Sequence, residues 1–439
     1  MEKNKICIVG LGFVGLTLAL TFTNKNIKII GIEINKKTVK SLKQSEPHFF
    51  EKGLINSLKR ANKNNLIKFS NKILEASDCN VFVITVGTPL NKDNKPNFSF
   101  IERCTKEIIS LKPKNPLIIL RSTVAVGTTR NVVIKLFSDA NIQADVTMCP
   151  ERTMAGFAME EIANLPQIIS GQNSNAINRA KEVFSSFAKH IIKASSIEAA
   201  ELIKLADNSS RDLYFSISNE LAFICESLNL NAYEIIKTAN DSYPRTNLAL
   251  PGLVGGPCLE KDPLILYESL NKKKYKPELF YAGRMLNKNT VNILIKWINE
   301  LGLDTRKTNA AVLGLAFKGN PETSDLRGSL AIDIAKILDK NNFKKILLYD
   351  PMDQVFEADE LKNQFPHHTL IKDFEEIIAT SDIAIISNNH TFFSKNHDPN
   401  NIWKINPNIK IFDFWNNFGD SLSTANNDKY RVFGIGNTQ

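Results

Sequence analysis

The stretch ICIVGLGFVGL, residues 6–16, decides the fold of the first half of this chain. Its first four residues are apolar and predict a short buried strand, after which Gly10, Gly12 and Gly15 follow the spacing GxGxxG. Between a strand and a helix, such glycines permit a tight turn, let a pyrophosphate approach the backbone and let the helix pack closely on the strand. A helix that begins at Phe13 would present its N-terminus to the phosphates. The stretch therefore predicts a dinucleotide-binding turn.

Glu33 closes the next predicted strand, IKIIGIE. An acidic group at this position can accept hydrogen bonds from both ribose hydroxyls and would repel the 2′-phosphate of NADP, so the expected cofactor is NAD. A glycine-rich turn without a ligand is the alternative, and the strand, the spacing and the acid together argue against it. The residues predicted to bind NAD here are Gly10, Gly12, Phe13, Val14, Gly15 and Glu33.

Outward from this turn, short apolar runs alternate with helical patterns, which predicts parallel, doubly wound sheets. The runs of the first half are ICIVG, IKIIGIE, NVFVITVG, PLIILRS, ADVTMC and PQIISG, and those beyond residue 304 are NAAVLGLAF, KKILLYD, DIAIIS and IKIFDFW. The segment between is helical: it opens with a capping-box spacing from Ser195 to Glu198, and it holds a second helical pattern from Tyr281 to about Leu301. We predict an α/β fold, two Rossmann-like doubly wound domains joined by a helical core, with domains at 1–194, 195–302 and 303–439.

Composition excludes several classes of protein. A chain of 439 residues with 43% hydrophobic and 23% charged residues can bury two or three cores, so disorder is not expected. The net charge is +9, but the lysines form no long basic block, and nucleic acid is not an expected partner. The six cysteines include no CxxC pair, which argues against a disulfide framework or a metal site and favours a reducing, cytoplasmic location.

One apolar segment imitates a targeting sequence. Residues 6–22 follow Lys3 and Lys5 as the apolar part of a signal peptide would. The three glycines interrupt the segment, however, and no small-x-small cleavage site follows Phe22. No other stretch approaches the roughly 18 apolar residues of a membrane span, so no membrane association is expected.

The stretch GGPCLEKD, residues 255–262, is the most unusual in the chain. Two glycines and a proline present Cys258 at the predicted start of a helix, where free N–H groups and the helix dipole favour a thiolate. If the helix continues, Asp262 lies one turn from the sulfur on the same face and can hold a water molecule. A lone cysteine is more often a small buried apolar residue, but this context favours a nucleophile.

Lys204 and Asn208 are spaced i, i+4 in the predicted helix AAELIKLADN and so project from one face. A lysine and an amide together can polarise a reacting oxygen and stabilise an oxyanion. The alternative is a solvated helix face, and nothing within this helix alone excludes it.

With these pieces assembled, the chain resembles the UDP-glucose/GDP-mannose dehydrogenase family over nearly its whole length. The stretches that carry the resemblance are KICIVGLGFVGLTLA, VGTPL, RSTVAVGTT, CPERTMAG, AAELIKLADNSSRD, ISNELAFICE, GLVGGPCLEKDP, GLAFKGNPETSDLRGS and YDPM. The resemblance implies an N-terminal NAD domain, a helical dimerisation core, a C-terminal domain that grips a nucleotide diphosphate, and a homodimer. Such enzymes usually serve surface polysaccharide or glycoconjugate synthesis.

The resemblance also implies roles for single residues. Cys258 matches the nucleophile, Lys204 and Asn208 the oxyanion-stabilising pair, and Asp262 the residue that positions the hydrolytic water. Thr123 and Glu151 match positions that assist the water and the reacting hydroxyl. Thr88 faces the nicotinamide, and Thr123 joins it in the cofactor set; the residues implied to contact substrate are Glu151, Arg152, Lys204, Asn208, Arg245, Asn247, Gly255 and Lys318, with Arg245 reaching across a dimer interface.

The chemistry explains the need for a thiol. An aldehyde in a dry pocket loses a hydride only after a nucleophile has made its carbon tetrahedral, which a thiolate can do. A thiohemiacetal, and then a thioester that is hydrolysed to the acid, would carry a primary alcohol through two oxidations at the expense of two NAD.

Departures from the family pattern bear on the substrate. CPERTMAG and YPRTNLALPG look like the subgroup that acts on UDP-N-acetylhexosamines, such as UDP-N-acetylmannosamine, but that subgroup often has His where this chain has Pro257. The pair Lys261-Asp262 looks like the UDP-glucose branch, so UDP-glucose 6-dehydrogenation is the alternative. Near the C-terminus, IFDFWNNF replaces an expected arginine-bearing turn, so that substrate contact is not carried over.

Two further hypotheses compete. A single-step β-hydroxyacid dehydrogenase of the 6-phosphogluconate type would need neither the cysteine nor a third, α/β domain. A catalytically silent nucleotide-sugar-binding protein would have no use for a thiolate beside Lys204, Asn208 and Asp262.

Overall fold

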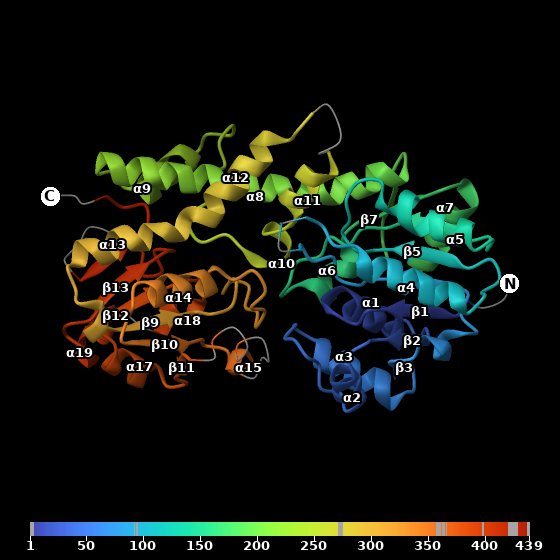
Figure 1. Cartoon of the computed structure of the whole chain (residues 1–439), viewed down its shortest axis with the longest axis horizontal. Helices are drawn as coiled ribbons and strands as arrows, with labels where there is room; N and C mark the ends of the chain where they lie inside the picture. Colours follow the sequence, from blue (N-terminus) through green and yellow to red (C-terminus); the bar gives the residue numbers. More distant parts are fainter. Residues whose placement is uncertain are drawn as a thin grey trace. The chain divides into compact units, whose positions relative to one another are not determined.

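The computed structural model describes residues 4–436 except 92, 94, 271–274, 357–360, 362–364, 366, 397, 398 and 420–428. The chain divides into two compact units. The first is Met1–Asp207 with Leu264–Lys276, and the second is Asn208–Pro263 with Pro277–Gln439. Figure 1 colours the chain along its sequence, so most of the first unit is blue to cyan and the sheet of the second is orange to red.

The described part of the first unit contains an eight-stranded sheet in the order β3-β2-β1-β4-β5-β6-β7-β8. Its strands are β1 (Ile6–Val9), β2 (Ile29–Ile32), β3 (Ile67–Ser70), β4 (Val81–Ile84), β5 (Leu117–Leu120), β6 (Asp145–Met148), β7 (Gln167–Gly171) and β8 (Ile191–Lys193). Central β1 pairs in parallel with both neighbours, Ile6 opposite Ile29 on one side and Val81 on the other. The order reverses between β1 and β4, and in such sheets ligands bind beyond the carboxyl ends of the strands at that point.

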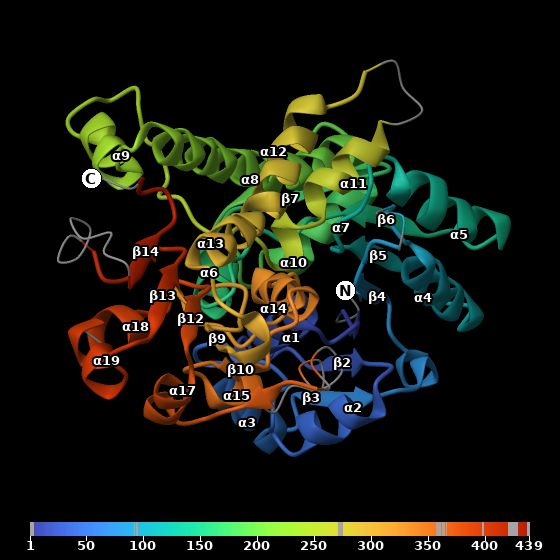
Figure 2. The same ribbon diagram turned by 60° about the vertical axis from the view of Figure 1, so that its left-hand side comes forward.

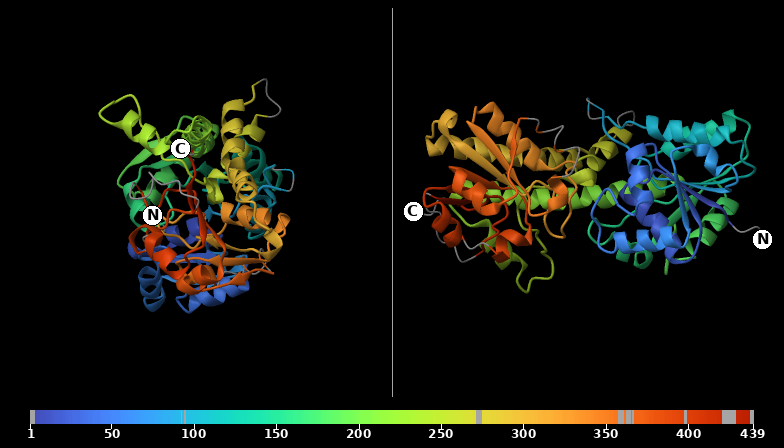
Figure 3. Two further views of the ribbon diagram at one scale, coloured as in Figure 1. Left: turned by 90° about the vertical axis from the view of Figure 1, so that its left-hand side faces the viewer. Right: turned by 90° about the horizontal axis from the view of Figure 1, so that it is seen from below.

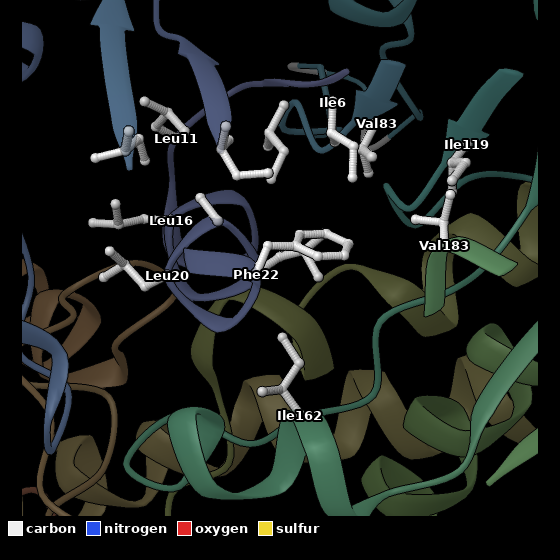
Figure 4. Packing of buried hydrophobic residues seen from close by; sticks show 14 of the residues in the cluster. Ile6, Leu11, Leu16, Leu20, Phe22, Val83, Ile119, Ile162 and Val183 are labelled. Atoms are coloured by element: carbon white, nitrogen blue, oxygen red, sulfur yellow. The ribbon is translucent and has the colours of Figure 1, made fainter. Parts of the chain in front are cut away.

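Helices cover both faces of this sheet, which explains why its central strands are apolar at every position. The helical elements of the unit are α1 (Phe13–Asn24), α2 (Lys36–Lys43), α3 (Leu54–Lys63), η1 (Ile73–Ala76), α4 (Ser99–Ser110), the π-helical η2 (Thr129–Ile134), α5 (Lys135–Asp139), α6 (Ala158–Asn164) and α7 (Ser174–Phe184). Ile6 and Val83 pack with α1, α6 and α7 on one face, as Figure 4 shows. Cys7 and Phe82 point to the other face and pack with α4. Alternate residues of each strand therefore enter separate cores.

One strand corrects the prediction of a wholly parallel sheet. Strand β7 runs antiparallel to β6, with Met148 opposite Ser170. The end of the β6–α6 loop is held by the buried Glu51, whose carboxylate accepts hydrogen bonds from the N–H groups of Gly156 and Ala158. The seven-residue α6 follows this loop and leads into β7, which runs in the opposite direction to β6.

The second unit contains a six-stranded parallel sheet among its described residues, in the order β11-β10-β9-β12-β13-β14. Its strands are β9 (Asn309–Leu313), β10 (Lys345–Tyr349), β11 (Thr369–Leu370), β12 (Ile383–Ile386), β13 (Lys410–Asp413) and β14 (Tyr430–Val432). Numbered from its own start, this order repeats that of the first six strands of the other sheet. The prediction of two doubly wound α/β sheets is confirmed, although β3, β8, β11 and β14 did not stand out as strands in the sequence.

Both faces of the second sheet are covered as well. The helical elements are α9 (Ala232–Asn240), α10 (Gly256–Leu259), α12 (Glu278–Asn289), η3 (Thr290–Asn292), α13 (Ile293–Leu301), η4 (Thr305–Lys307), α14 (Leu330–Lys340), α15 (Asp353–Phe356), α17 (Phe374–Thr380), α18 (Thr391–Asn396) and α19 (Pro399–Ile405). Trp297 of α13 packs edge-on against Phe412 of β13, whereas Ile411 belongs to a core that includes α17. Helices α13 and α17 therefore cover opposite faces of the sheet in Figure 2.

The longest helix, α8 (Ile197–Leu228), has 32 residues, and Figure 3 draws it in green as one unbroken element. Its cap differs from the predicted one. The hydroxyl of Ser196, not Ser195, accepts the N–H of Ala199 at 3.0 Å, and Glu198 pairs with Arg130 instead of closing a capping box. The Glu198 carboxylate thus combines an ion pair to Arg130 with local hydrogen bonds to its own N–H and to Ser196. Helix α11 (Asp262–Ser269) crosses the boundary between the units.

The second predicted helix, Tyr281 to Leu301, begins earlier and is interrupted. Helix α12 begins at Glu278, and the 3₁₀ turn η3 separates it from α13. The predicted helical segment 195–302 is divided between the two compact units, and the three-domain boundaries stay a prediction. Among the described helices, none is long and apolar enough to cross a membrane.

Candidate active site

The turn after β1 has the geometry of a phosphate-binding turn. Gly10 has a φ of 92°, which favours glycine, and its N–H donates to the Ile32 carbonyl at 2.8 Å. The Thr85 hydroxyl donates to the carbonyl of Gly10 at 2.6 Å. A Cβ on Gly15 would collide with that same carbonyl, so only glycine lets α1 pack this closely on β1.

The residues around the turn fit NAD. A Cβ on Gly12 would meet nothing within 4 Å, so the protein's own packing does not require this glycine, whereas a close pyrophosphate would. Glu33 accepts the N–H groups of Leu11 and Asn35 at 2.9 and 3.0 Å. A carboxylate has about four lone-pair sites, so acceptor capacity is left for ribose hydroxyls. Phe13 and Val14 begin α1 and are half-buried.

Hydrogen bonds join the loops that follow β4 and β5, at the carboxyl ends of these strands. The hydroxyl of Thr88 donates to the carbonyl of Thr123 at 2.6 Å, and that of Ser122 donates to the carbonyl of Val86 at 2.6 Å. The fold therefore brings the two predicted threonines together.

Glu151 lies in a charged environment that the sequence did not reveal. Its carboxylate pairs with the fully buried guanidinium of Arg121 and accepts the N–H groups of Arg152 and Thr153. Burial by itself raises the pKa of Glu151, but the charge and hydrogen bond of Arg121 outweigh it and hold the pKa below the usual value; Lys204 adds to the lowering. Glu151 is therefore an anion at neutral pH.

Two further predicted residues lie near this anion. The charge of Lys204 lowers the pKa of Glu151, so the ammonium group of Lys204 lies close enough to interact with that carboxylate. Lys204 is only 8% exposed. The Arg152 guanidinium donates to the Pro166 carbonyl at 3.0 Å and lies 3.5 Å from Asp207.

Cys258 lies in the second unit as the third residue of the four-residue α10, and it is exposed, whereas the other five cysteines are buried. The turn before it is tightly constrained. Gly256 has a φ of 91°, its N–H donates to the Gly328 carbonyl at 2.8 Å, and a Cβ there would enter the ring of Phe317. A Cβ on Gly255 would strike the same Gly328 carbonyl.

The predicted helical link from Cys258 to Asp262 is wrong. Helix α10 ends at Leu259, and α11 begins at Asp262, so the two residues belong to separate helices. Tertiary hydrogen bonds orient the Asp262 carboxylate instead: it is fully buried and accepts from Asn208 Nδ2 and from Lys261 Nζ, each at 2.6 Å. At the break, the N–H of Lys261 donates to the Cys258 carbonyl at 3.2 Å, an i→i+3 bond that tightens the last turn and ends the α-helical pattern.

Lys261 contacts the predicted site residue Asp262, although in the sequence it served only as a point of resemblance to the UDP-glucose branch. Burial lowers its pKa, but the charges of Asp262 and Cys258 outweigh burial, and the net shift is upward. A positive charge is thus held beside the thiol and the carboxylate. Its position between those two residues in the sequence was the available signal.

The turn after β9 repeats the turn after β1. Gly314 has a φ of 89°, and its N–H donates to the Tyr349 carbonyl at 2.8 Å. Buried Asp350 stands where Glu33 stands in the first sheet and accepts the N–H groups of Leu315 and Ala316, and burial raises its pKa to about 6. This turn leads to Phe317 and Lys318, and so brings the loop of Lys318 against the Cys258 turn.

The remaining predicted residues are at the surface of the second unit. Arg245 is exposed and lies over the ring of Tyr243. Asn247 is exposed, and its carbonyl accepts the hydroxyl of Tyr214. The predicted residues therefore divide between the units: the cofactor residues with Thr123, Glu151, Arg152 and Lys204 belong to the first, and Asn208, Arg245, Asn247, Gly255, Cys258, Asp262 and Lys318 to the second. The described residues hold no group of three or more acidic, His or Cys side chains suited to a metal ion.

The fold and these sites define a dinucleotide-binding α/β protein whose second α/β unit carries an exposed thiol. Three family models match the chain in order. They describe the NAD binding domain, residues 4–188; the central domain, residues 198–289; and the UDP binding domain, residues 311–420, of one family.

Relatives match over most of their length. The UDP-N-acetyl-D-mannosamine dehydrogenase of Campylobacter jejuni is 33% identical, over 80% of this chain and 87% of that protein. The protein of the same name from Methanococcus maripaludis strain C7 is 31% identical, over 99% and 100%. The solved structure of UDP-D-ManNAc dehydrogenase from Pyrococcus horikoshii matches with a TM-score of 0.86 and 27% identity, over 99% of this chain and 100% of that one.

The chain therefore belongs to the UDP-glucose/GDP-mannose dehydrogenase family. It is an NAD-dependent oxidoreductase of the nucleotide-sugar dehydrogenase class.

Proposed function

We propose that the protein oxidises the C6 primary alcohol of a UDP-N-acetylhexosamine to the uronic acid, with four electrons passing to two NAD. The relatives named above as UDP-N-acetyl-D-mannosamine dehydrogenases support this substrate class. The observation that carries the reaction is the exposed Cys258 thiol, with Lys261, Asp262 and Asn208 joined by hydrogen bonds beside it. In this proposal the domain at residues 1–194 binds NAD, residues 195–302 form a helical core, and the domain at residues 303–439 binds the sugar nucleotide.

NAD, when bound, supplies the hydride acceptor for both oxidations. Cys258 attacks the aldehyde carbon and forms a C–S bond, which makes that carbon tetrahedral. The positive charge of Lys261 is held close to the sulfur that makes this attack. After the second oxidation the product is a thioester, and water replaces the sulfur to give the carboxylic acid.

The buried carboxylate of Asp262 positions that water in our proposal, because Asn208 and Lys261 hold it in one orientation. Lys204 and Asn208 stabilise the oxyanion of each tetrahedral species. Glu151, kept ionised by Arg121, accepts a hydrogen bond from the reacting hydroxyl or from the water, and Thr123 assists it. Lys318, Arg245 and the other predicted substrate residues bind the sugar nucleotide.

UDP-glucose stays the second candidate substrate, because Lys261-Asp262 resembles that branch and Pro257 departs from the N-acetylhexosamine pattern. A silent binding protein is disfavoured, since binding alone needs no exposed thiol.

The test is the number of NADH released per sugar. Purified protein is offered UDP-N-acetylmannosamine, UDP-N-acetylglucosamine, UDP-glucose and GDP-mannose separately, and absorbance follows the reaction. We expect two NADH per molecule of one UDP-N-acetylhexosamine. The Cys258→Ala variant should lose turnover by at least about 10³-fold, as removal of a covalent nucleophile does in other enzymes. One NADH per sugar, or full turnover by the variant, would overturn the thiol mechanism.

We also propose a homodimer and a cytoplasmic location. Exposed apolar residues of the second unit follow α8 and α12, namely Tyr214, Ile217, Ile224, Leu228, Leu279 and Tyr281. The spacing of those on α8 places them on one face, which a second copy would cover. All six cysteines are free thiols, as expected in a reducing compartment.

A further inference from the structure

We propose that Arg284 is a positioning residue for the nucleophile: its guanidinium grips the backbone on both sides of Cys258 and holds the thiol in place. This inference rests on the proposed function only for the role of Cys258.

The guanidinium of Arg284 binds two backbone carbonyl groups, one before Cys258 in the sequence and one after it. Arg284 Nη2 donates to the Val254 carbonyl at 2.8 Å, and Nη1 donates to the Leu259 carbonyl at 3.1 Å. Val254 precedes the double glycine, and Leu259 ends α10. A planar guanidinium presents its donors in a fixed fork, so it can hold two acceptors at a set separation.

A buried network holds Arg284 itself. Its side chain is 2% exposed and pairs with Asp212 of α8, 1% exposed, at 2.8 Å. Asn287, one turn further along α12, donates to the carboxylate of Asp212 at 3.0 Å and to its carbonyl at 2.8 Å. The carboxylate neutralises the buried guanidinium, and two hydrogen-bonded helices fix its direction.

The same network reaches the loop once more. Asn287 Oδ1 accepts from Asn219 Nδ2 at 2.8 Å, and Asn219 Oδ1 accepts the N–H of Gly252 at 2.9 Å. The backbone from residue 252 to residue 259 is therefore held at three points from α8 and α12.

The segment needs such support because it cannot position the thiol by itself. Helix α10 has four residues, and Gly255 and Gly256 precede the cysteine, so local backbone preferences restrict it little. Arg284 is too deeply buried to touch substrate. Its effect on the reaction therefore passes through Cys258.

The reactivity of the thiol reports this role directly. Cys258 is exposed, whereas burial raises the pKa of the other five thiols, to about 12 for Cys79 and about 11 for Cys149. Iodoacetamide will therefore label Cys258 selectively near neutral pH. Its labelling rate at one pH depends on how the sulfur is held and can be measured without any sugar substrate.

The experiment compares Arg284→Lys with a matched control, Arg431→Lys, in the full-length protein. Arg431 is also a mostly buried arginine of the second unit, but it pairs with Glu226 and Glu300 and holds the C-terminal strand. Lysine keeps the charge but cannot hold both carbonyls. For Arg284→Lys we expect the rate of Cys258 labelling to fall and kcat to fall about 100-fold, with KM for the sugar nearly unchanged, because a thiol that is held less firmly is misplaced for attack. Arg431→Lys should lower only the melting temperature.

A second variant, Asp212→Asn, keeps the shape of the network and removes the charge that supports Arg284, and a smaller change in the same direction is expected. If both Arg284→Lys and Asp212→Asn fold and keep the labelling rate and kcat of the unmodified protein, the proposal is overturned. An equal loss of kcat in Arg431→Lys would also overturn it, because that result would indicate a general structural effect. If no sugar is oxidised even by the unmodified protein, the proposed function fails, while the labelling comparison still decides the role of Arg284.

Discussion

At the scale of single residues, the state of Glu151 depends on its partner Arg121. The guanidinium is fully buried, donates also to Gln167 at 3.1 Å and lies over the ring of Phe184. Since this cation holds the pKa of Glu151 below its usual value, Glu151 is an anion at neutral pH that can accept a hydrogen bond, but it has no proton of its own to donate.

We predict that Arg121→Met raises the pKa of Glu151, because burial is then opposed only by weaker effects. In the wild type, Glu151 stays ionised as the pH falls to its usual pKa and below. In the variant, Glu151 becomes protonated at a higher pH than in the wild type. The acidic limb of the kcat/KM profile should therefore move to higher pH, and a buried unpaired carboxylate should cost about 3–5 kcal/mol of unfolding free energy. Steady-state kinetics across pH and urea denaturation measure the two effects.

The double variant Arg121→Met with Glu151→Gln is the control. Because it removes both charges, it should recover most of the lost stability while activity stays low. An unmoved acidic limb in the single variant would contradict the assigned role of Arg121.

At the scale of elements, Glu201 fastens the loop that carries Thr123 to the helix that carries Lys204. Glu201 is 1% exposed, and its carboxylate accepts the N–H of Gly127 at 2.6 Å and the N–H and hydroxyl of Thr129 at 2.7 and 2.6 Å. Glu201 precedes Lys204 by about one turn of α8. One side chain thus sets the distance between a predicted cofactor residue and a predicted catalytic residue.

We predict that Glu201→Gln lowers the unfolding free energy by about 1–3 kcal/mol and raises KM for NAD, because an amide offers one acceptor oxygen to three donors. Glu198→Gln is the matched control: Glu198 joins α8 to the same loop region through Arg130, but the pair is partly exposed, and its loss should cost about 1 kcal/mol or less. Equal effects of both substitutions on KM would show that Glu201 has no special role.

At the scale of the whole molecule, the proposed dimer links assembly to activity. The apolar groove between α8 and α12 is lined by Leu213, Ile217, Leu221, Leu279 and Leu286 among others. Arg245 belongs to the same unit and is exposed. If a second copy covers the groove, each copy can offer its Arg245 to the other.

We predict that Ile217→Asp with Ile224→Asp yields a monomer without turnover, because two charges would be buried in the interface. Light scattering after gel filtration measures the mass, and NADH release measures activity. Ile192→Asp, at a 50% exposed position in the edge strand β8 of the first unit, should change neither. A monomer with full turnover would refute the contribution of Arg245 across the interface.

Local patterns allowed much of this molecule to be predicted. The GxGxxG turn, the apolar runs of the central strands and the long helix are encoded by neighbouring residues, and the structure has them where the sequence places them. The edge strand β3 did not stand out because only its alternate residues are buried. Two local features were mispredicted. Ser196 and not Ser195 caps α8, and α10, whose Gly256 is held by the distant Gly328, ends at Leu259.

The sequence by itself determined the two α/β sheets, the cofactor turn and the presence of a thiol in an unusual turn, because strand and helix periodicity and glycine conformations are local properties. Only the tertiary structure decided the direction of β7, the partners of Asp262, and the buried charges of Arg121, Glu201 and Arg284. The partners of these charges lie far away in the chain. Burial and Coulomb interactions depend on distance in space, which the order of residues does not state.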